Sequence, residues 1–172
     1  MTILLVGYRG CGKSTIGKRL ANELWYKFLD TDAEVCKRAG GKTIREIFEQ
    51  QGEPAFRDLE SSVVADACRL PDHVVALGGG AVTRPENRAA IKSAGAKVVY
   101  LKCAPDVLLK RIQSDPETGR TRPPLTHHGG GIEEITTLLA EREPMYREVA
   151  AKELDVTYLS AEEAARYVVR LV

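Results

Sequence analysis

The residues most able to do chemistry form a glycine-rich segment near the start of the chain. The segment reads Gly7-Tyr-Arg-Gly-Cys-Gly-Lys-Ser14 and matches the pattern G-x-x-x-x-G-K-[ST]. Glycines let such a loop wrap a phosphate with its N–H groups pointing inward, and the following helix adds its positive N-terminal end. In this pattern the lysine reaches the β- and γ-phosphates and the hydroxyl ligates Mg²⁺. We therefore expect a phosphate loop (residues 7–14) in which Lys13 contacts phosphate, Ser14 binds the ion, and the cradle is completed by Gly10, Cys11, Gly12 and Thr15.

The context of the phosphate loop favours a nucleoside triphosphate site over a glycine-rich turn without a ligand. The apolar run Ile3 to Val6 precedes it, as a buried strand would, and a helical pattern follows. A guanine-specific GTPase normally carries an Asn-Lys-x-Asp element, but the only asparagines are Asn22 and Asn87, and neither precedes a lysine. Larger motor-type ATPases need much longer chains. A small-molecule or nucleotide kinase is therefore the main expectation.

Two carboxylates, Asp30 and Asp32, stand at the end of the second predicted strand. Ligands of open parallel sheets bind beyond the carboxyl ends of the strands, so this pair is expected to face the phosphate loop. One carboxylate would help to hold Mg²⁺, directly or through water, and the other would orient a substrate hydroxyl for phosphoryl transfer. The alternative is that an aspartate here only caps the helix that follows.

Arg57, Arg142 and the run Gly78 to Gly80 are weaker candidates when each is taken alone. A guanidinium binds a planar carboxylate through two parallel hydrogen bonds, yet Arg57 lies in a helical pattern where Glu60 could hold it as an ordinary surface pair. Arg142 likewise fits a solvated helix face. The glycines end the third predicted strand, where they would offer backbone N–H groups to a substrate or simply turn the chain toward a helix at Pro85.

A long loop is expected from Ser114 to Gly131, because this stretch contains three prolines and four glycines but little apolar material. Loops of this length in compact domains are usually functional or disordered. Arg122 in this loop could close over a transferred phosphate, exclude water and offset charge in the transition state. The alternative is a flexible basic surface loop.

Strand and helix patterns alternate along the whole chain. Strands are expected at 3–6, 28–30, 74–77, 97–101 and 154–158, and helices at 13–24, 43–51, 53–70, 85–94, 105–113, 132–149 and from 160 onward. Two of these helices open with capping boxes, at Thr43 and at Ser160. The alternation predicts βαβ units with right-handed crossovers, and hence a parallel sheet covered by helices on both faces, a three-layer α/β sandwich.

Composition and charge limit the class of protein. A chain of 172 residues with 44% hydrophobic and 28% charged residues fits one globular domain, residues 1–172. A net charge of +1 argues against a general binder of nucleic acids or membrane surfaces. The longest uncharged apolar runs are about six residues, far short of the roughly 18 that span a bilayer. The four cysteines form no CxxC pair and no secretion signal precedes them, so reduced thiols in a cytoplasm are expected.

Taken together, these residues resemble the shikimate kinase family. The pieces that carry the resemblance occur in the family's order over almost the whole chain: Gly7–Ser14, Leu29-Asp-Thr-Asp32, Phe56-Arg57-x-x-Glu60, Leu77-Gly-Gly-Gly-Ala81, Thr121-Arg-Pro123, and Glu141-Arg142 followed by Tyr146-Arg147. The resemblance implies a P-loop kinase with a five-stranded parallel sheet in the order 2-3-1-4-5. It also implies ATP-dependent phosphorylation of the 3-hydroxyl of shikimate, a step in chorismate and aromatic amino-acid biosynthesis.

The resemblance also implies roles for the site residues. Lys13 and Ser14 would contact phosphate and Mg²⁺, with Asp30 as a water-mediated partner of the ion, and Arg111 would stack on adenine. Asp32 would hold the substrate hydroxyls and act as base. The substrate carboxylate would be gripped by Arg57 and Arg142, and backbone groups would come from Gly78, Gly79 and Gly80. Arg122 would be the arginine of a mobile lid at about 114–131, opposite a substrate-binding helical region at about 32–60.

The partners implied are ATP, one Mg²⁺ ion and shikimate, in a monomer without nucleic acid or membrane partners. Two other functions stay open on the sequence. One is a related small kinase that acts on a sugar acid or a nucleoside monophosphate. The other is a nucleotide-dependent binding module that has lost catalysis. The joint presence of five residues argues against it: Lys13, Ser14, Asp30, Asp32 and Arg122.

Overall fold

Five parallel strands form the sheet in the computed structural model, which describes residues 1–122 and 131–172. The strands are β1 (Ile3–Val6), β2 (Lys27–Asp30), β3 (His73–Ala76), β4 (Lys97–Lys102) and β5 (Lys152–Asp155). Their order is β2-β3-β1-β4-β5, and every neighbouring pair is parallel. The predicted sheet order is therefore confirmed.

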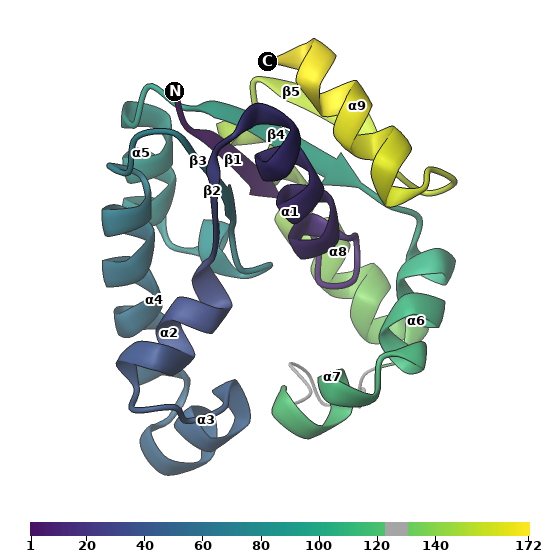
Figure 1. Ribbon diagram of the computed structural model, residues 1–172. Coiled ribbons are helices and arrows are strands. Elements are labelled where there is room, and N and C mark those ends of the chain that lie inside the picture. The colour runs from purple at the N-terminus through teal and green to yellow at the C-terminus, as the bar shows by residue number, and fades with distance from the viewer. Residues whose placement is uncertain (123–130) are drawn as a thin grey trace.

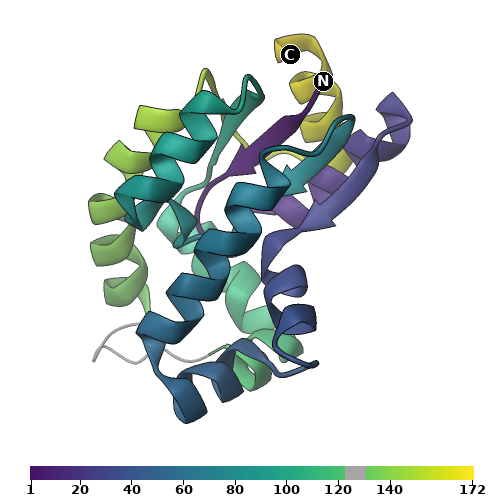
Figure 2. The same cartoon turned by 90° about the vertical axis from the view of Figure 1, so that its left-hand side faces the viewer.

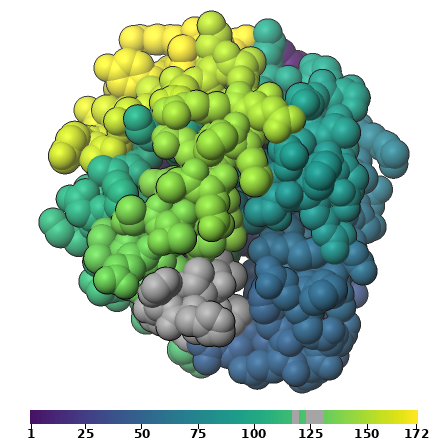
Figure 3. Space-filling model, turned by 180° about the vertical axis from the view of Figure 1, so that it is seen from behind, coloured from purple at the N-terminus to yellow at the C-terminus, as the bar shows by residue number. Residues whose placement is uncertain are grey.

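Helices cover both faces of the sheet, as predicted for a three-layer sandwich (Figure 1). Helices α1 (Lys13–Leu24) and α9 (Ala161–Leu171) lie on one face. Helices α4 (Glu53–Ala67), α5 (Pro85–Ser93) and α8 (Ile132–Val149) lie on the other, where α8 and α5 are neighbours in the view from behind (Figure 3). Within the described residues no helix has both the length and the apolar character needed to cross a lipid bilayer.

The alternating side chains of β1 divide the core into two layers. Ile3 and Leu5 pack toward α1 and α9, whereas Leu4 and Val6 pack toward α4, α5 and α8. All four side chains are buried. A strand that is covered on both faces needs apolar residues at every position, which explains why β1 reads as a continuous apolar run rather than as an alternating one.

The remaining helices gather beyond the carboxyl ends of the strands. They are α2 (Thr31–Arg38), α3 (Ile44–Gln51), α6 (Pro105–Ser114) and α7 (Pro116–Thr121), with a short 3₁₀ turn at Ala81–Thr83. A separate apolar cluster around Val35, Ile47 and Phe56 joins α2, α3 and α4. Figures 1 and 2 show α3 and α7 at the same end of the molecule, and the two helices are in contact.

Both predicted capping boxes are present. The Thr43 hydroxyl accepts the N–H of Glu46, and the Glu46 carboxylate accepts the N–H of Thr43. Ser160 and Glu163 form the same reciprocal pair at the start of α9. These caps satisfy backbone N–H groups that have no partner inside the helix.

The predicted loop from Ser114 to Gly131 is wrong in its first part, where α7 forms. Proline fits the first turn of a helix, and Pro116 opens α7 despite the glycine within it. Residues 123–130 of the predicted lid lie outside the described residues. Helix α2 lies at the start of the predicted helical region at about 32–60, for which no separate helix bounds were predicted. The predicted helix from Glu53 to Leu70 ends at Ala67.

The fifth strand starts two residues earlier and ends three residues earlier than predicted. The alternation of Leu154, Val156 and Tyr158 suggested a strand through Tyr158, but β5 ends at Asp155 and the Tyr158 side chain is 91% exposed. The Asp155 carboxylate accepts hydrogen bonds from the amide and hydroxyl of Thr157, which turns the chain. Because β5 pairs only with β4, its polar residues can face solvent at the sheet edge.

Candidate active site

The phosphate loop connects β1 to α1, the position that the sequence pattern requires. Gly10 and Gly12 have φ angles of +86° and +98°, a region that favours glycine. The ammonium group of Lys13 folds back over the loop and donates to the carbonyl oxygens of Gly7 (2.7 Å) and Tyr8 (2.9 Å). The side chain of Lys13 therefore lies against the backbone of the phosphate loop, and α1 begins at this same residue.

A cleft of about 430 Å³ opens beside this loop, and we call it the nucleotide cleft. Its walls include Arg111 and Ile112 from α6 and Val156 from the turn after β5. The Arg111 guanidinium donates to the carbonyl oxygens of Cys11 (3.4 Å) and Val156 (3.3 Å), so it bridges the phosphate loop and that turn. The cleft also contains the predicted nucleotide-binding residues Gly10, Cys11, Gly12, Lys13, Ser14 and Thr15.

Asp30 both caps a helix and contacts the residue expected to bind Mg²⁺, the two alternatives that the sequence left open. One carboxylate oxygen accepts the N–H groups of Asp32 (3.0 Å) and Ala33 (3.3 Å), which caps α2. The other accepts a hydrogen bond from the Ser14 hydroxyl. A hydroxyl and a carboxylate thus meet at the edge of the nucleotide cleft, and oxygen donors of this kind suit Mg²⁺.

Asp32 and Arg122 form an ion pair of 2.8 Å at the centre of the site. The Asp32 residue is only 9% exposed. Arg122 follows α7, and its carbonyl oxygen accepts a hydrogen bond from Arg45 of α3 (3.3 Å). This places the arginine of the predicted lid directly on the carboxylate expected to hold the substrate hydroxyl.

A second, smaller pocket of about 50 Å³ lies beyond this ion pair, and we call it the acceptor pocket. Its apolar wall is formed by Ile44, Phe48 and Phe56, with the two phenyl rings 5.1 Å apart. Its polar wall carries both predicted carboxylate-binding arginines, Arg57 and Arg142. Arg57 and Arg142, which alone looked like surface residues, are both buried here.

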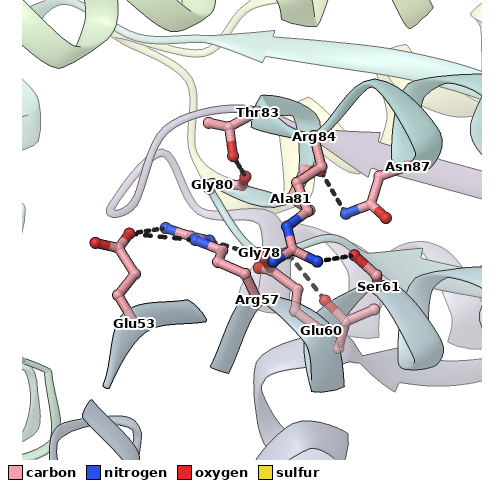
Figure 4. A network of polar contacts seen from close by, with 12 residues as sticks. Glu53, Arg57, Glu60, Ser61, Gly78, Gly80, Ala81, Thr83, Arg84 and Asn87 are labelled. Carbon is pink, nitrogen blue, oxygen red and sulfur yellow. Dashed lines mark hydrogen bonds and ion pairs between the residues drawn. The ribbon is translucent and has the colours of Figure 1, made fainter. Parts of the chain in front are cut away.

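Two carboxylates hold Arg57 in place (Figure 4). Glu60 accepts from Nη1 at 2.7 Å, and Glu53 accepts from Nε and Nη2 at 3.3 Å. Burial lowers the pKa of Arg57, but the charges of Glu60 and Glu53 outweigh it and hold the pKa above its ordinary value. Burial raises the pKa of Glu60, which is 1% exposed, and Arg57 opposes that rise only in part.

The three glycines after β3 make room for these side chains. A Cβ at Gly78 would lie 2.5 Å from Asp32 Oδ1, and one at Gly80 would lie 2.6 Å from Arg57 Nη2. Two threonine hydroxyls hold the turn: the Gly78 N–H donates to that of Thr31, and the Gly80 carbonyl accepts from that of Thr83. Figure 4 shows this turn beside Arg57. The run is therefore a close-packed wall of the pocket rather than only a connection to α5.

The carbonyl oxygen of Gly79 accepts a hydrogen bond from Tyr146 of α8 at 2.6 Å. The Tyr146 ring stacks on Tyr100, with ring centroids 5.1 Å apart, and burial raises the pKa of its hydroxyl. The hydroxyl therefore stays protonated and donates. This contact ties the middle of the triple glycine to the core.

Every predicted site residue except Gly78 lines the nucleotide cleft or the acceptor pocket, and Gly78 packs beside them against Asp32. Sequence reasoning missed Arg9, Thr31 and Tyr146 as site residues, and treated Glu60 only as a helix partner. Arg9 occupies a variable position of the phosphate-loop pattern, and Tyr146 acts from a distant helix, so neither had a local signal. Glu60 was detectable from its spacing to Arg57.

Comparison with known proteins agrees with this geometry. The family model described as Shikimate kinase matches residues 9–172. A curated shikimate kinase of Rhodopirellula baltica is 40% identical over 161 residues, which cover 94% of this chain and 84% of the relative. Shikimate kinase 2 of Yersinia pestis (strain Pestoides F) is 45% identical over 156 residues, covering 91% and 87%.

Solved structures give the same result. Shikimate kinase from Acinetobacter baumannii in complex with shikimate superimposes with a TM-score of 0.91 at 35% identity, covering 99% of this chain and 91% of that one. A gluconokinase from Sinorhizobium meliloti has a TM-score of 0.64 at 21% identity, which shows a shared fold alone. The chain belongs to the shikimate kinase family.

Proposed function

We propose that this protein transfers the γ-phosphoryl group of ATP to the 3-hydroxyl of shikimate, giving shikimate 3-phosphate and ADP. The observation that carries the proposal is the junction of two pockets at Asp32 and Arg122, with a phosphate loop on one side and two buried arginines on the other. Family membership and the relative solved with shikimate bound support the same acceptor.

The nucleotide occupies the larger cleft. The backbone N–H groups of the phosphate loop and Lys13 surround the β- and γ-phosphates, and Arg111 lies on the adenine side. Ser14 and Asp30 would hold one Mg²⁺ ion, Asp30 directly or through water. When bound, this ion withdraws charge from the phosphoryl oxygens.

Shikimate occupies the acceptor pocket. Its carboxylate is bound by Arg57 and Arg142, because guanidinium groups match a planar anion in both charge and geometry. The backbone of Gly78, Gly79 and Gly80 lines the other side of the ring. Glu53 and Glu60 keep Arg57 in its orientation before substrate arrives, which lowers the entropy lost on binding.

Transfer takes place at Asp32. Its carboxylate orients the 3-hydroxyl and receives the hydroxyl proton, while the hydroxyl oxygen bonds to phosphorus and the bond to the β-phosphate oxygen breaks. Arg122 leaves Asp32 before this step and stabilises charge on the phosphoryl oxygens while the transfer takes place. The described part of the predicted lid, α7 with Arg122, lies against α3 and helps to keep water out.

A substrate panel tests this function. Release of ADP from Mg-ATP is measured in a coupled assay with shikimate, gluconate or AMP as acceptor, and without acceptor. We expect turnover with shikimate alone. Turnover with gluconate or AMP instead would keep the phosphate site and overturn the acceptor assignment, and ADP binding without any turnover would favour a binding module. We further expect the enzyme to act as a monomer in the cytoplasm, without nucleic acid or membrane partners, which gel filtration and cell fractionation test.

A further inference from the structure

Arg9 occupies the boundary between the two pockets. It lies in the phosphate loop and lines both the nucleotide cleft and the acceptor pocket, a property it shares with Asp32, Gly79 and Arg122. By contrast, Arg57 and Arg142 line only the acceptor pocket. The phosphoryl group has to cross this boundary, so Arg9 stands beside its path rather than at the far end where a substrate carboxylate is bound.

Among the described residues Arg9 has no anionic partner, unlike Arg122, the other arginine at this boundary. Among the described residues it makes no hydrogen bond or ion pair, and its Nε is buried without an acceptor. Arg57 is paired with Glu53 and Glu60, and Arg122 is paired with Asp32. A buried donor that lacks a partner is costly, and a ligand anion in the adjacent pocket would supply one.

The local charges favour an anion at this place. Burial lowers the pKa of Arg9, and the neighbouring cations Arg122 and Arg142 lower it further, while Tyr8 and Glu134 oppose the shift in part. Arg9, Arg122 and Arg142 all line the acceptor pocket, so three like charges surround a volume of about 50 Å³. A multiply charged anion placed among them relieves this repulsion.

We propose that the Arg9 guanidinium contacts the oxygens of the phosphoryl group while it passes from ATP to the acceptor, and so acts as a catalytic residue beside Arg122. Arg9 contributes hydrogen-bond donors and positive charge that are used most fully when charge spreads over the transferring group. No proton or leaving group passes through Arg9. This inference rests on the proposed function.

The test compares Arg9→Met, which keeps the length of the stem, and Arg9→Lys, which keeps the charge but loses the fork. Arg69→Met on the exposed surface is the matched control. We expect Arg9→Met to lower kcat on the order of 100-fold, with the KM for shikimate changed less than about threefold and the Kd of ADP unchanged. Arg9→Lys should recover part of kcat. Affinity for ADP with aluminium fluoride and shikimate, a mimic of the transferring phosphoryl group, should fall in parallel with kcat.

Three results would overturn the inference. A large rise in the KM for shikimate at unchanged kcat would make Arg9 a ligand of the substrate carboxylate. Wild-type kinetics in both Arg9 variants would show that it contacts no reacting group. If Arg9→Met does not fold, unchanged kcat in Arg9→Lys would contradict the proposal. The wild-type protein tests the proposed function separately. If that function is wrong, the wild-type protein shows no shikimate-dependent ADP release, whatever the Arg9 variants do.

Discussion

Arg57 is oriented by the protein itself, because Glu53 accepts from its Nε and Nη2 while Glu60 accepts from its Nη1. Lysine at this position would keep one positive charge but could not present two parallel donors to a carboxylate. We therefore expect Arg57→Lys to bind shikimate about tenfold more weakly or worse, which corresponds to a loss of ~1.4 kcal/mol. Titration calorimetry measures this affinity.

A matched control is Arg84→Lys, because Arg84 also pairs with a carboxylate, Asp58, but lines neither the nucleotide cleft nor the acceptor pocket. It should leave shikimate affinity unchanged. Equal affinities of Arg57→Lys and the wild-type protein would remove Arg57 from the carboxylate site.

Gly80 tests how closely the turn packs against that guanidinium. Its φ of −97° permits alanine, but the added Cβ would lie 2.6 Å from Arg57 Nη2, and Glu53 and Glu60 restrain the guanidinium from moving away. We expect Gly80→Ala to raise the Kd for shikimate on the order of tenfold without changing the Kd of ADP. Normal shikimate affinity in Gly80→Ala would contradict this prediction, because it would show that Arg57 can move away from the added methyl group without loss of binding.

At the scale of elements, α7 carries the lid arginine to the reaction centre. Arg122 contacts Asp32 across the junction, while Arg45 of α3 holds its backbone. Because a lid arginine acts mainly on the transition state, Arg122→Ala should lower kcat about 100-fold or more while KM changes much less. Steady-state kinetics, with Arg120→Ala as a neighbouring charge control, measure both. An effect on KM alone would assign Arg122 to ground-state binding.

The turn after β5 makes stability depend on pH. Hydrogen bonds from the hydroxyl and amide of Thr157 hold the pKa of Asp155 below its ordinary value of 3.8. Since the folded pKa is the lower one, this stabilisation is complete above the unfolded pKa and is lost as pH falls through the folded pKa. We expect Asp155→Asn to be about 0.5–1 kcal/mol less stable at neutral pH, with the difference shrinking in acid.

Urea unfolding from about pH 7 down to about pH 2 measures this dependence. Glu49→Gln, which removes an exposed carboxylate on α3, is the control. A difference between Asp155→Asn and the wild-type protein that stays constant over this range would contradict the assignment to an ionised Asp155.

At the scale of the whole molecule, the parts predicted from sequence are those with a strong local signal. Strands β1, β3 and β4 are buried on both faces and read as apolar runs, so their positions were predictable, whereas the sheet order was implied only by the family resemblance. The polar edge strand β5 and the short helix α7 lacked such a signal. Tertiary contacts, not local propensity, fix the limits of both elements.

The residues of the candidate site also differ in how far the sequence predicted them. Lys13 and Ser14 follow from a contiguous pattern, whereas Arg57 and Arg142 gained their assignment from resemblance and are brought together only by the fold. Arg9 and Tyr146 could not be predicted, because what distinguishes them is a missing partner in one case and a contact from a distant helix in the other.

The central claim is that phosphoryl transfer to shikimate takes place at Asp32, and one comparison tests it directly. Shikimate-dependent ADP release and the mass of the product are measured for the wild-type protein and for Asp32→Asn, with the Kd of ADP determined for both. The account predicts one phosphorylated shikimate per ADP from the wild-type protein, and from Asp32→Asn no turnover but near-normal ADP affinity. Near-wild-type turnover by Asp32→Asn, or loss of its ADP affinity together with activity, would contradict it.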